Sequence, residues 1–180
     1  MNILETVLKA AGGSAVSTLA KNFGLNDGQI SSVIGQLVPA LSRGMAKNTQ
    51  STGGLEDLLG ALTKGNHGRY MEQPNVLTDQ ATTDDGNKIL SHVLGGKHVS
   101  RVLAGRTAEK TGVAPGLIKK LLPIVASLAM GAMSQQKSSL GVNSPQSSGI
   151  GGLLSGFLDQ DNDGSLADDL LGIAGKMFFR

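Results

Sequence analysis

Apolar residues recur along this chain at the three- and four-residue spacing of amphipathic helices, and no stretch keeps the strict alternation that predicts a strand. Glycines interrupt the pattern where we expect helices to end, at residues 12–13, 24, 65, 95–96 and 112. The predicted helices begin near residues 3, 14, 27, 55, 84, 98, 115 and 166. The sequence therefore predicts an all-α fold with a compact multihelical domain.

One pattern of small and apolar residues occurs twice: residues 104–133 repeat the spacing found in residues 16–45. In each copy a small residue, a glycine and an isoleucine precede a long apolar helix: Ala20, Gly24 and Ile30, then Ala108, Gly112 and Ile118. In a helix–turn–helix the small residue lets two helices cross closely and the glycine takes a left-handed turn. We therefore predict a duplicated helix–turn–helix corner. Pro39 and Pro123 fall inside the long helices, and we expect each to kink or divide its helix.

Two interpretations of this corner remain open, a DNA reader and a structural corner of the core. The first long helix has no Lys or Arg before Arg43. The second offers Lys119 and Lys120 but is otherwise apolar, like a buried helix. We favour the structural corner, because a nucleic-acid interface usually shows a denser stripe of positive charge.

Composition divides the chain into three parts. Residues 1–134 hold the periodic helices and the repeat. Residues 135–152 are rich in Gln, Ser, Gly, Asn and Pro, which is typical of a flexible linker. Residues 153–180 hold a short apolar run, an acidic loop and a last amphipathic helix. The tail is net negative, whereas the rest of the chain is net positive.

Three local predictions concern the middle of the chain. Residues 66–82 show no apolar period, which predicts a surface connection. We expect Asp84 and Asp85 to cap the N-terminus of the next helix, where carboxylates favour the helix dipole, rather than to form a catalytic pair. In the helix that begins at residue 98 we expect three side chains to face inward, those of Val99, Val102 and Leu103.

The 180 residues include no cysteine, which excludes disulfides, thiolate metal sites and a cysteine nucleophile. The first residues lack the basic region and apolar core of a secretory signal. The longest apolar run, residues 121–133, contains Pro123 and Ser127 and is too short to span a bilayer. We expect a cytoplasmic protein without a membrane span.

The acidic loop in the tail opens like the calcium loop of an EF-hand. Its first, third, fifth and seventh positions are Asp159, Asp161, Asp163 and Ser165, with Gly164 at the turn. The twelfth position, where a bidentate Glu is expected, holds Leu170, so a shortened loop would have to close with Asp168 or Asp169. The alternative is an acidic cap on the last helix with no ion. We predict weak calcium binding as the only cofactor interaction.

Few residues offer catalytic chemistry. The histidines are His67, His92 and His98, and the glycines at 95 and 96 separate the last two, so no i, i+4 metal pair exists. The chain has no nucleophile elbow, phosphate loop or dinucleotide motif. We expect capping or exposed histidines and a protein that is not an enzyme, with an enzyme of unknown class as one alternative.

Several ordered motifs resemble one bacterial family. The stretch Asp85-Gly-Asn-Lys-Ile-Leu-Ser-His-Val-Leu-Gly, then Thr111-Gly, Leu121-Leu-Pro-Ile and Met130-Gly-Ala-Met, is similar to the YidB-like family of unknown function. The closing stretch from Gly151 to Ser165 is also similar to tails in that family. The resemblance implies a compact multihelical bacterial protein and brings no established activity. Its motif includes Asn87, His92 and Gly95, which we expect to shape the helix ends around residues 86–96.

These observations favour a non-enzymatic helical protein that acts as a protein-interaction module, through an unknown partner or by self-association. The weak calcium loop belongs to its tail. The alternative is a DNA-associated regulator that uses the paired corners, which we do not favour.

Overall fold

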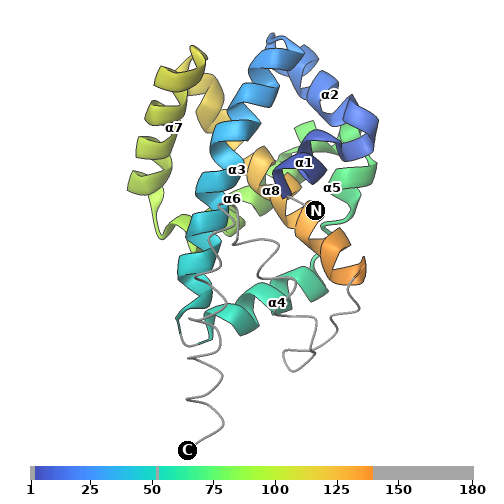
Figure 1. Ribbon diagram of the computed structural model, residues 1–180, viewed down its shortest axis with the longest axis vertical. Coiled ribbons are helices and arrows are strands. Elements are labelled where there is room, and N and C mark those ends of the chain that lie inside the picture. The colour runs from blue at the N-terminus through green and yellow to red at the C-terminus, as the bar shows by residue number, and fades with distance from the viewer. Residues whose placement is uncertain (1–2, 52, 140–180) are drawn as a thin grey trace, which may run out of the picture.

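The computed structural model describes residues 3–51 and 53–139, and these residues form helices and no strand (Figure 1). The α-helices are α1 (Ile3–Leu8), α2 (Ser14–Phe23), α3 (Asp27–Thr49), α4 (Gly54–Lys64), α5 (Arg69–Glu72), α6 (Gln80–Leu94), α7 (Lys97–Thr111) and α8 (Pro115–Ser139). Two 3₁₀ turns join them, η1 (Ala10–Gly13) and η2 (Pro74–Thr78). The predicted all-α class is confirmed.

The central element is α8, which runs through the middle of the fold and packs against α1, α3, α4, α5, α6 and α7 (Figure 1). Every residue from 121 to 133 is buried, on all faces of the helix. A helix that is apolar all round must be covered on every side, and the six neighbours supply this cover. The core of the protein therefore forms around α8.

The apolar run of α8 lies in a longer helix than the sequence predicted. Within residues 115–138 an 18-residue window has a mean hydropathy of 1.5, so by length and composition the helix is apolar enough to cross a membrane. The fold buries 78% of that apolar window, as is typical of the core helix of a globular protein. The helix also continues to Ser139, so residues 135–139 of the predicted linker are helical.

Both internal prolines lie within continuous helices. Pro39 lies inside α3 and Pro123 inside α8, and neither divides its helix. A proline has no N–H, so the carbonyls of Gly35 and Lys119 lose their usual helical donors. The helices remain whole because burial of their apolar faces outweighs the loss of one hydrogen bond each.

The two predicted corners share the same local geometry. Gly24 ends α2 with φ 65°, and Gly112 ends α7 with φ 69°. Each glycine donates its N–H to the carbonyl of the alanine four residues earlier. At the first corner the side chain of Asn26 accepts from the backbone N–H of Gln29 at 2.8 Å, and the Gln29 side chain accepts from the Asn26 N–H at 3.0 Å. Through this capping box Asn26 is the N-cap of α3.

The segment 66–82 is not a surface connection, and that prediction is wrong. It forms α5, η2 and the start of α6, and it buries Tyr70, Met71 and Leu77. The hydroxyl of Thr82 donates to the carbonyl of Val76 at 2.5 Å. The Thr82 carbonyl accepts from the buried hydroxyl of Ser127 at 3.0 Å, which ties α6 to α8. These hydrogen bonds hold the segment against the core. It buries only a few large apolar side chains, and for this reason its sequence shows no helical period of apolar residues.

Since α6 begins at Gln80, Asp84 and Asp85 lie in its second turn and do not cap it. The N-cap position is Asp79, whose side chain makes no capping hydrogen bond. The prediction of a capping role for the two aspartates is therefore wrong. This shift matters for the site below, because it frees Asp85 to interact with α5 and the loop before it.

The prediction for α7 is also wrong in part. Val99 and Val102 are 46% and 41% exposed, and Leu103 is half-buried. The residues that α7 buries are the small Ala104 and Thr107. These residues allow α7 to lie close to α8 at the edge of the bundle (Figure 1), and this packing leaves the valines outside.

A close helix contact in the core lies between α6 and α8, at Gly86. A Cβ atom added there would lie 1.9 Å from the carbonyl oxygen of Pro123. That atom belongs to the backbone of the central helix, so it cannot move without shifting α8 itself. The crossing of α6 over α8 therefore requires glycine at position 86.

We predict that Gly86→Ala lowers the free energy of unfolding by roughly 3 kcal/mol, because the added methyl group forces the two helices apart. Urea unfolding followed by circular dichroism measures this. The matched control is Gly105→Ala in α7, where an added Cβ meets no atom within 4 Å. The control should be neutral or more stable by up to about 1 kcal/mol, since Ala favours helix interiors. Equal stability of the two variants would contradict the close crossing.

Candidate functional site

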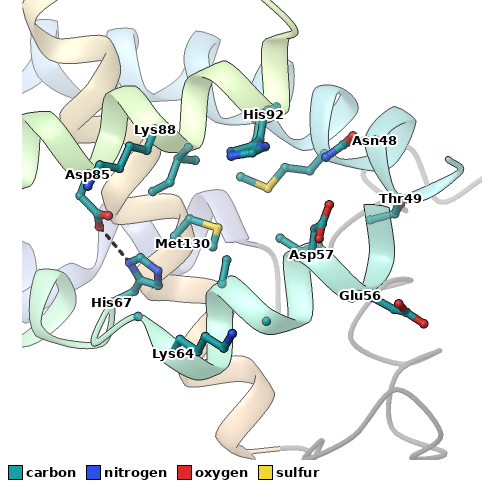
Figure 2. A pocket seen from close by; sticks show the side chains of 17 residues that line it. Asn48, Thr49, Glu56, Asp57, Lys64, His67, Asp85, Lys88, His92 and Met130 are labelled. Carbon is teal, nitrogen blue, oxygen red and sulfur yellow. Dashed lines mark ion pairs between the residues drawn. The ribbon is translucent and has the colours of Figure 1, made fainter. Parts of the chain in front are cut away.

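The candidate site is a groove of about 650 Å³ between α3, α4, α6 and α8, which we call the α4 groove (Figure 2). Its apolar side chains come from all four helices and are Met45, Leu58, Ala61, Ile89, Val93 and Met130. Polar and charged side chains of both signs surround them: Asn48, Thr49, Glu56, Asp57, Lys64, Lys88 and His92. The groove thus has an apolar floor and a mixed polar rim.

At one end of the groove lies His67, which is buried and only 5% exposed. Its Nδ1 lies 3.2 Å from Oδ2 of Asp85, as Figure 2 shows. The same oxygen accepts a hydrogen bond from the hydroxyl of Tyr70 at 2.9 Å, and Nη2 of Arg69 donates to that hydroxyl at 2.9 Å. We call these four residues the Asp85 network.

Local sequence explains how the Asp85 network is placed. A Cβ atom on Gly65 would lie 2.0 Å from Nε2 of His67, so the imidazole ring occupies the space that a side chain at position 65 would need. The guanidinium of Arg69 lies 4.9 Å from the centroid of the Tyr70 ring, which adds a cation–π contact. The prediction of capping or exposed histidines is wrong for His67, because the absence of a side chain at Gly65 leaves room for the buried ring.

The contact between His67 and Asp85 is an electrostatic contact and not a well-formed hydrogen bond. Although the two atoms are 3.2 Å apart, the ring nitrogen has no hydrogen-bond partner with good geometry. The Asp85 side chain is 30% exposed and lines the groove. A buried polar group without a hydrogen bond costs free energy, and the nearby carboxylate of Asp85 offsets part of that cost for His67.

The pKa values of Tyr70 and Arg69 follow from their surroundings. Burial raises the pKa of Tyr70, the hydrogen bond from Arg69 lowers it, and the hydrogen bond to Asp85 raises it further. The net direction is upward, which favours the neutral phenol. The hydrogen bond to Tyr70 raises the pKa of Arg69, so this guanidinium stays charged. The phenol therefore acts as a neutral donor to Asp85.

The residues of the family-like motif do not converge on one site. His92 is exposed and lies on the rim of the α4 groove. Asn87 lies in another groove, lined by α6, α7 and α8. Gly95 ends α6 with φ 68°, as its predicted role at a helix end requires. Sequence reasoning missed Gly65, Tyr70 and the contact of Asp85 with His67. The one sequence signal for this network was that the chain has a single tyrosine.

The predicted calcium ligands lie outside the described residues. They are Asp159, Asp161, Asp163, Ser165, Asp168 and Asp169. Within residues 3–51 and 53–139, no group of three or more His, Asp or Glu side chains is placed to hold a metal ion. The described helical body thus offers no such metal cluster of its own.

The family model described as bacterial protein of unknown function (DUF937) matches residues 5–136. The chain belongs to this family. The YidB-like resemblance is consistent with the match, which extends from α1 into α8 and includes both the α4 groove and the Asp85 network. No curated protein and no solved structure gives a significant match. Membership of the family supplies no activity, so function must be argued from the geometry.

We predict that Tyr70 ionises at higher pH in the folded protein than in the unfolded chain, whose tyrosine titrates near about 10. A raised folded pKa contributes stability below pH 10, and this stability is lost as the pH rises through the folded value. Tyr70 is the only tyrosine and the chain has no tryptophan, so tyrosinate absorbance reports on this residue alone. Protein unfolded in urea is the control. A folded midpoint equal to or below the unfolded one would contradict the buried network.

Proposed function

We propose that this protein is a non-enzymatic helical interaction module that binds a segment of a partner protein in the α4 groove. The observation that carries the proposal is the apolar floor next to the partly exposed carboxylate of Asp85, which contacts the buried imidazole of His67. Grooves of this kind usually bind an apolar anchor and orient it with a few polar groups.

The chemistry of the groove indicates what the bound segment contains. Met45 and Met130 contribute flexible, polarisable side chains that adapt to an apolar anchor such as Leu or Met. The partly exposed carboxylate of Asp85 can accept from a donor on the segment, either a backbone N–H or a Lys or Arg side chain. The ligand is therefore an amphipathic segment with a donor beside its apolar anchor.

The proposal gives His67 and Asp85 a binding role rather than a catalytic one. The hydroxyl of their network belongs to Tyr70, which is 1% exposed and does not line the groove. A nucleophile must reach its substrate, and this hydroxyl lies behind Asp85.

The geometry of α8 does not favour the DNA-binding alternative. A recognition helix presents side chains along its length to the major groove. In α8 only the first turns, up to Lys120, are largely exposed before the helix enters the core. A helix in this position holds the fold together and has little surface left for base contacts.

A photo-crosslinking amino acid at position 61 tests the proposed groove. Ala61 is exposed and lines the groove, so the probe should form a discrete adduct with one partner protein in cells of the source bacterium. The matched control is the same probe at Ala81, which is exposed in the first turns of α6 and does not line the groove. Asp85→Asn should reduce the adduct at position 61 several-fold, because it removes the charged acceptor. Equal adducts at both positions, or none, would contradict the proposal.

We also propose that the acidic tail holds calcium weakly through the carboxylates of Asp159, Asp161 and Asp163. Without a bidentate Glu in the twelfth position, the dissociation constant should be on the order of 10⁻⁴ to 10⁻³ M. Isothermal titration of the intact chain should show calcium binding, and the double variant D161N/D163N should lose it. If millimolar calcium gives no heat, the stretch is an acidic helix cap.

A further inference from the structure

A second groove, of about 640 Å³, lies on the other side of α6, and we call it the α7 groove. Its floor is apolar and buried, formed by Leu90, Leu122 and Pro123. Around the floor stand three cationic side chains, Lys97, Arg101 and Lys119, and three neutral polar ones, Asn87, Ser91 and Ser100. Within residues 3–51 and 53–139, no acidic side chain lines this groove.

The helices place the three cations from two directions. Lys97 is the first residue of α7, and Arg101 follows one turn later on the same face of that helix. Lys119 faces the groove from α8. Among the residues that the structure describes, none of the three forms a salt bridge. Like charges that share a groove repel one another, so an anion between them is attracted by all three.

The backbone at the start of α7 adds to this positive potential. The N-cap position is Gly96, which lines the groove and supplies no side chain to the free N–H groups of the first turn. No acidic residue lies in that turn. The positive end of the helix dipole therefore stays uncompensated beside Lys97 and Arg101.

We propose that the α7 groove binds a phosphorylated ligand. Its phosphate lies between Lys97, Arg101 and Lys119, and a hydrogen bond from the side-chain amide of Asn87 orients it. Arg is suited to bidentate phosphate contacts, and Lys supplies point charges. The groove is larger than a phosphate ion, so the floor of Leu90, Leu122 and Pro123 accepts the rest of the ligand. The phosphate belongs either to a soluble molecule or to a lipid headgroup.

This site is independent of the function proposed for the α4 groove. The lining residues of the two grooves do not overlap, although α6 contributes to both. A failure of crosslinking at position 61 would leave the phosphate site standing, and the reverse also holds.

The test uses two probes on the intact protein, sodium pyrophosphate in solution and vesicles of phosphatidylcholine with or without phosphatidylglycerol. Titration calorimetry follows the first probe and co-sedimentation follows the second. The groove variant is K97Q/R101Q/K119Q, and the charge-matched control is K21Q/R43Q/K47Q, whose three exposed positions on α2 and α3 do not line the groove. Circular dichroism verifies that both variants fold.

We expect the groove variant to bind at least tenfold more weakly than the wild type, and the control to change less than about threefold. Binding should also weaken as sodium chloride rises, since the contacts are between exposed charges. Binding of pyrophosphate identifies a soluble ligand. Binding only to vesicles that contain phosphatidylglycerol identifies a lipid headgroup. If neither probe binds, or if the control loses as much affinity as the groove variant, the proposal is overturned.

Discussion

The close crossing of α6 over α8 is the constraint on which both grooves depend. At Gly86 the backbone of α6 lies so near the carbonyl of Pro123 that no side chain fits between them. Its two neighbours in sequence line different grooves, Asp85 the α4 groove and Asn87 the α7 groove. The short stretch Asp-Gly-Asn thus combines a close backbone contact in the core with one polar residue for each groove. Any change that separates α6 from α8 should alter the shape of both grooves.

The parts of the fold that sequence could predict depend on local interactions. The left-handed turns at Gly24 and Gly112 and the capping box at Asn26 each involve residues within one turn of a helix. Their chemistry is therefore visible in a few adjacent letters. The division into helices was also predictable, since glycines end four of them.

The parts that failed depend on distant residues. The hydrogen bond from the Ser127 hydroxyl to the Thr82 carbonyl joins positions 45 residues apart, and no local pattern in residues 66–82 predicts it. The exposure of Val99 and Val102 follows from the close approach of α7 to the core, which selects small residues for the buried side. In the candidate site, Asp85 meets His67 and Tyr70 only because α6 starts earlier than its acidic residues suggested. The start of α6 and the buried polar contacts of Asp85 depend on tertiary packing, so a single sequence specifies them only weakly.

The absence of a side chain at Gly86 also fixes the sidedness of α6. A helix turns by about 100° per residue, so rotating α6 by one position in either direction would bring the side chain of Asp85 or Asn87 toward Pro123. The backbone of α8 leaves no room for either. The helix α6 therefore separates the two grooves in one fixed orientation. Asp85 must line the α4 groove and Asn87 the α7 groove, because turning the helix would force α6 and α8 apart.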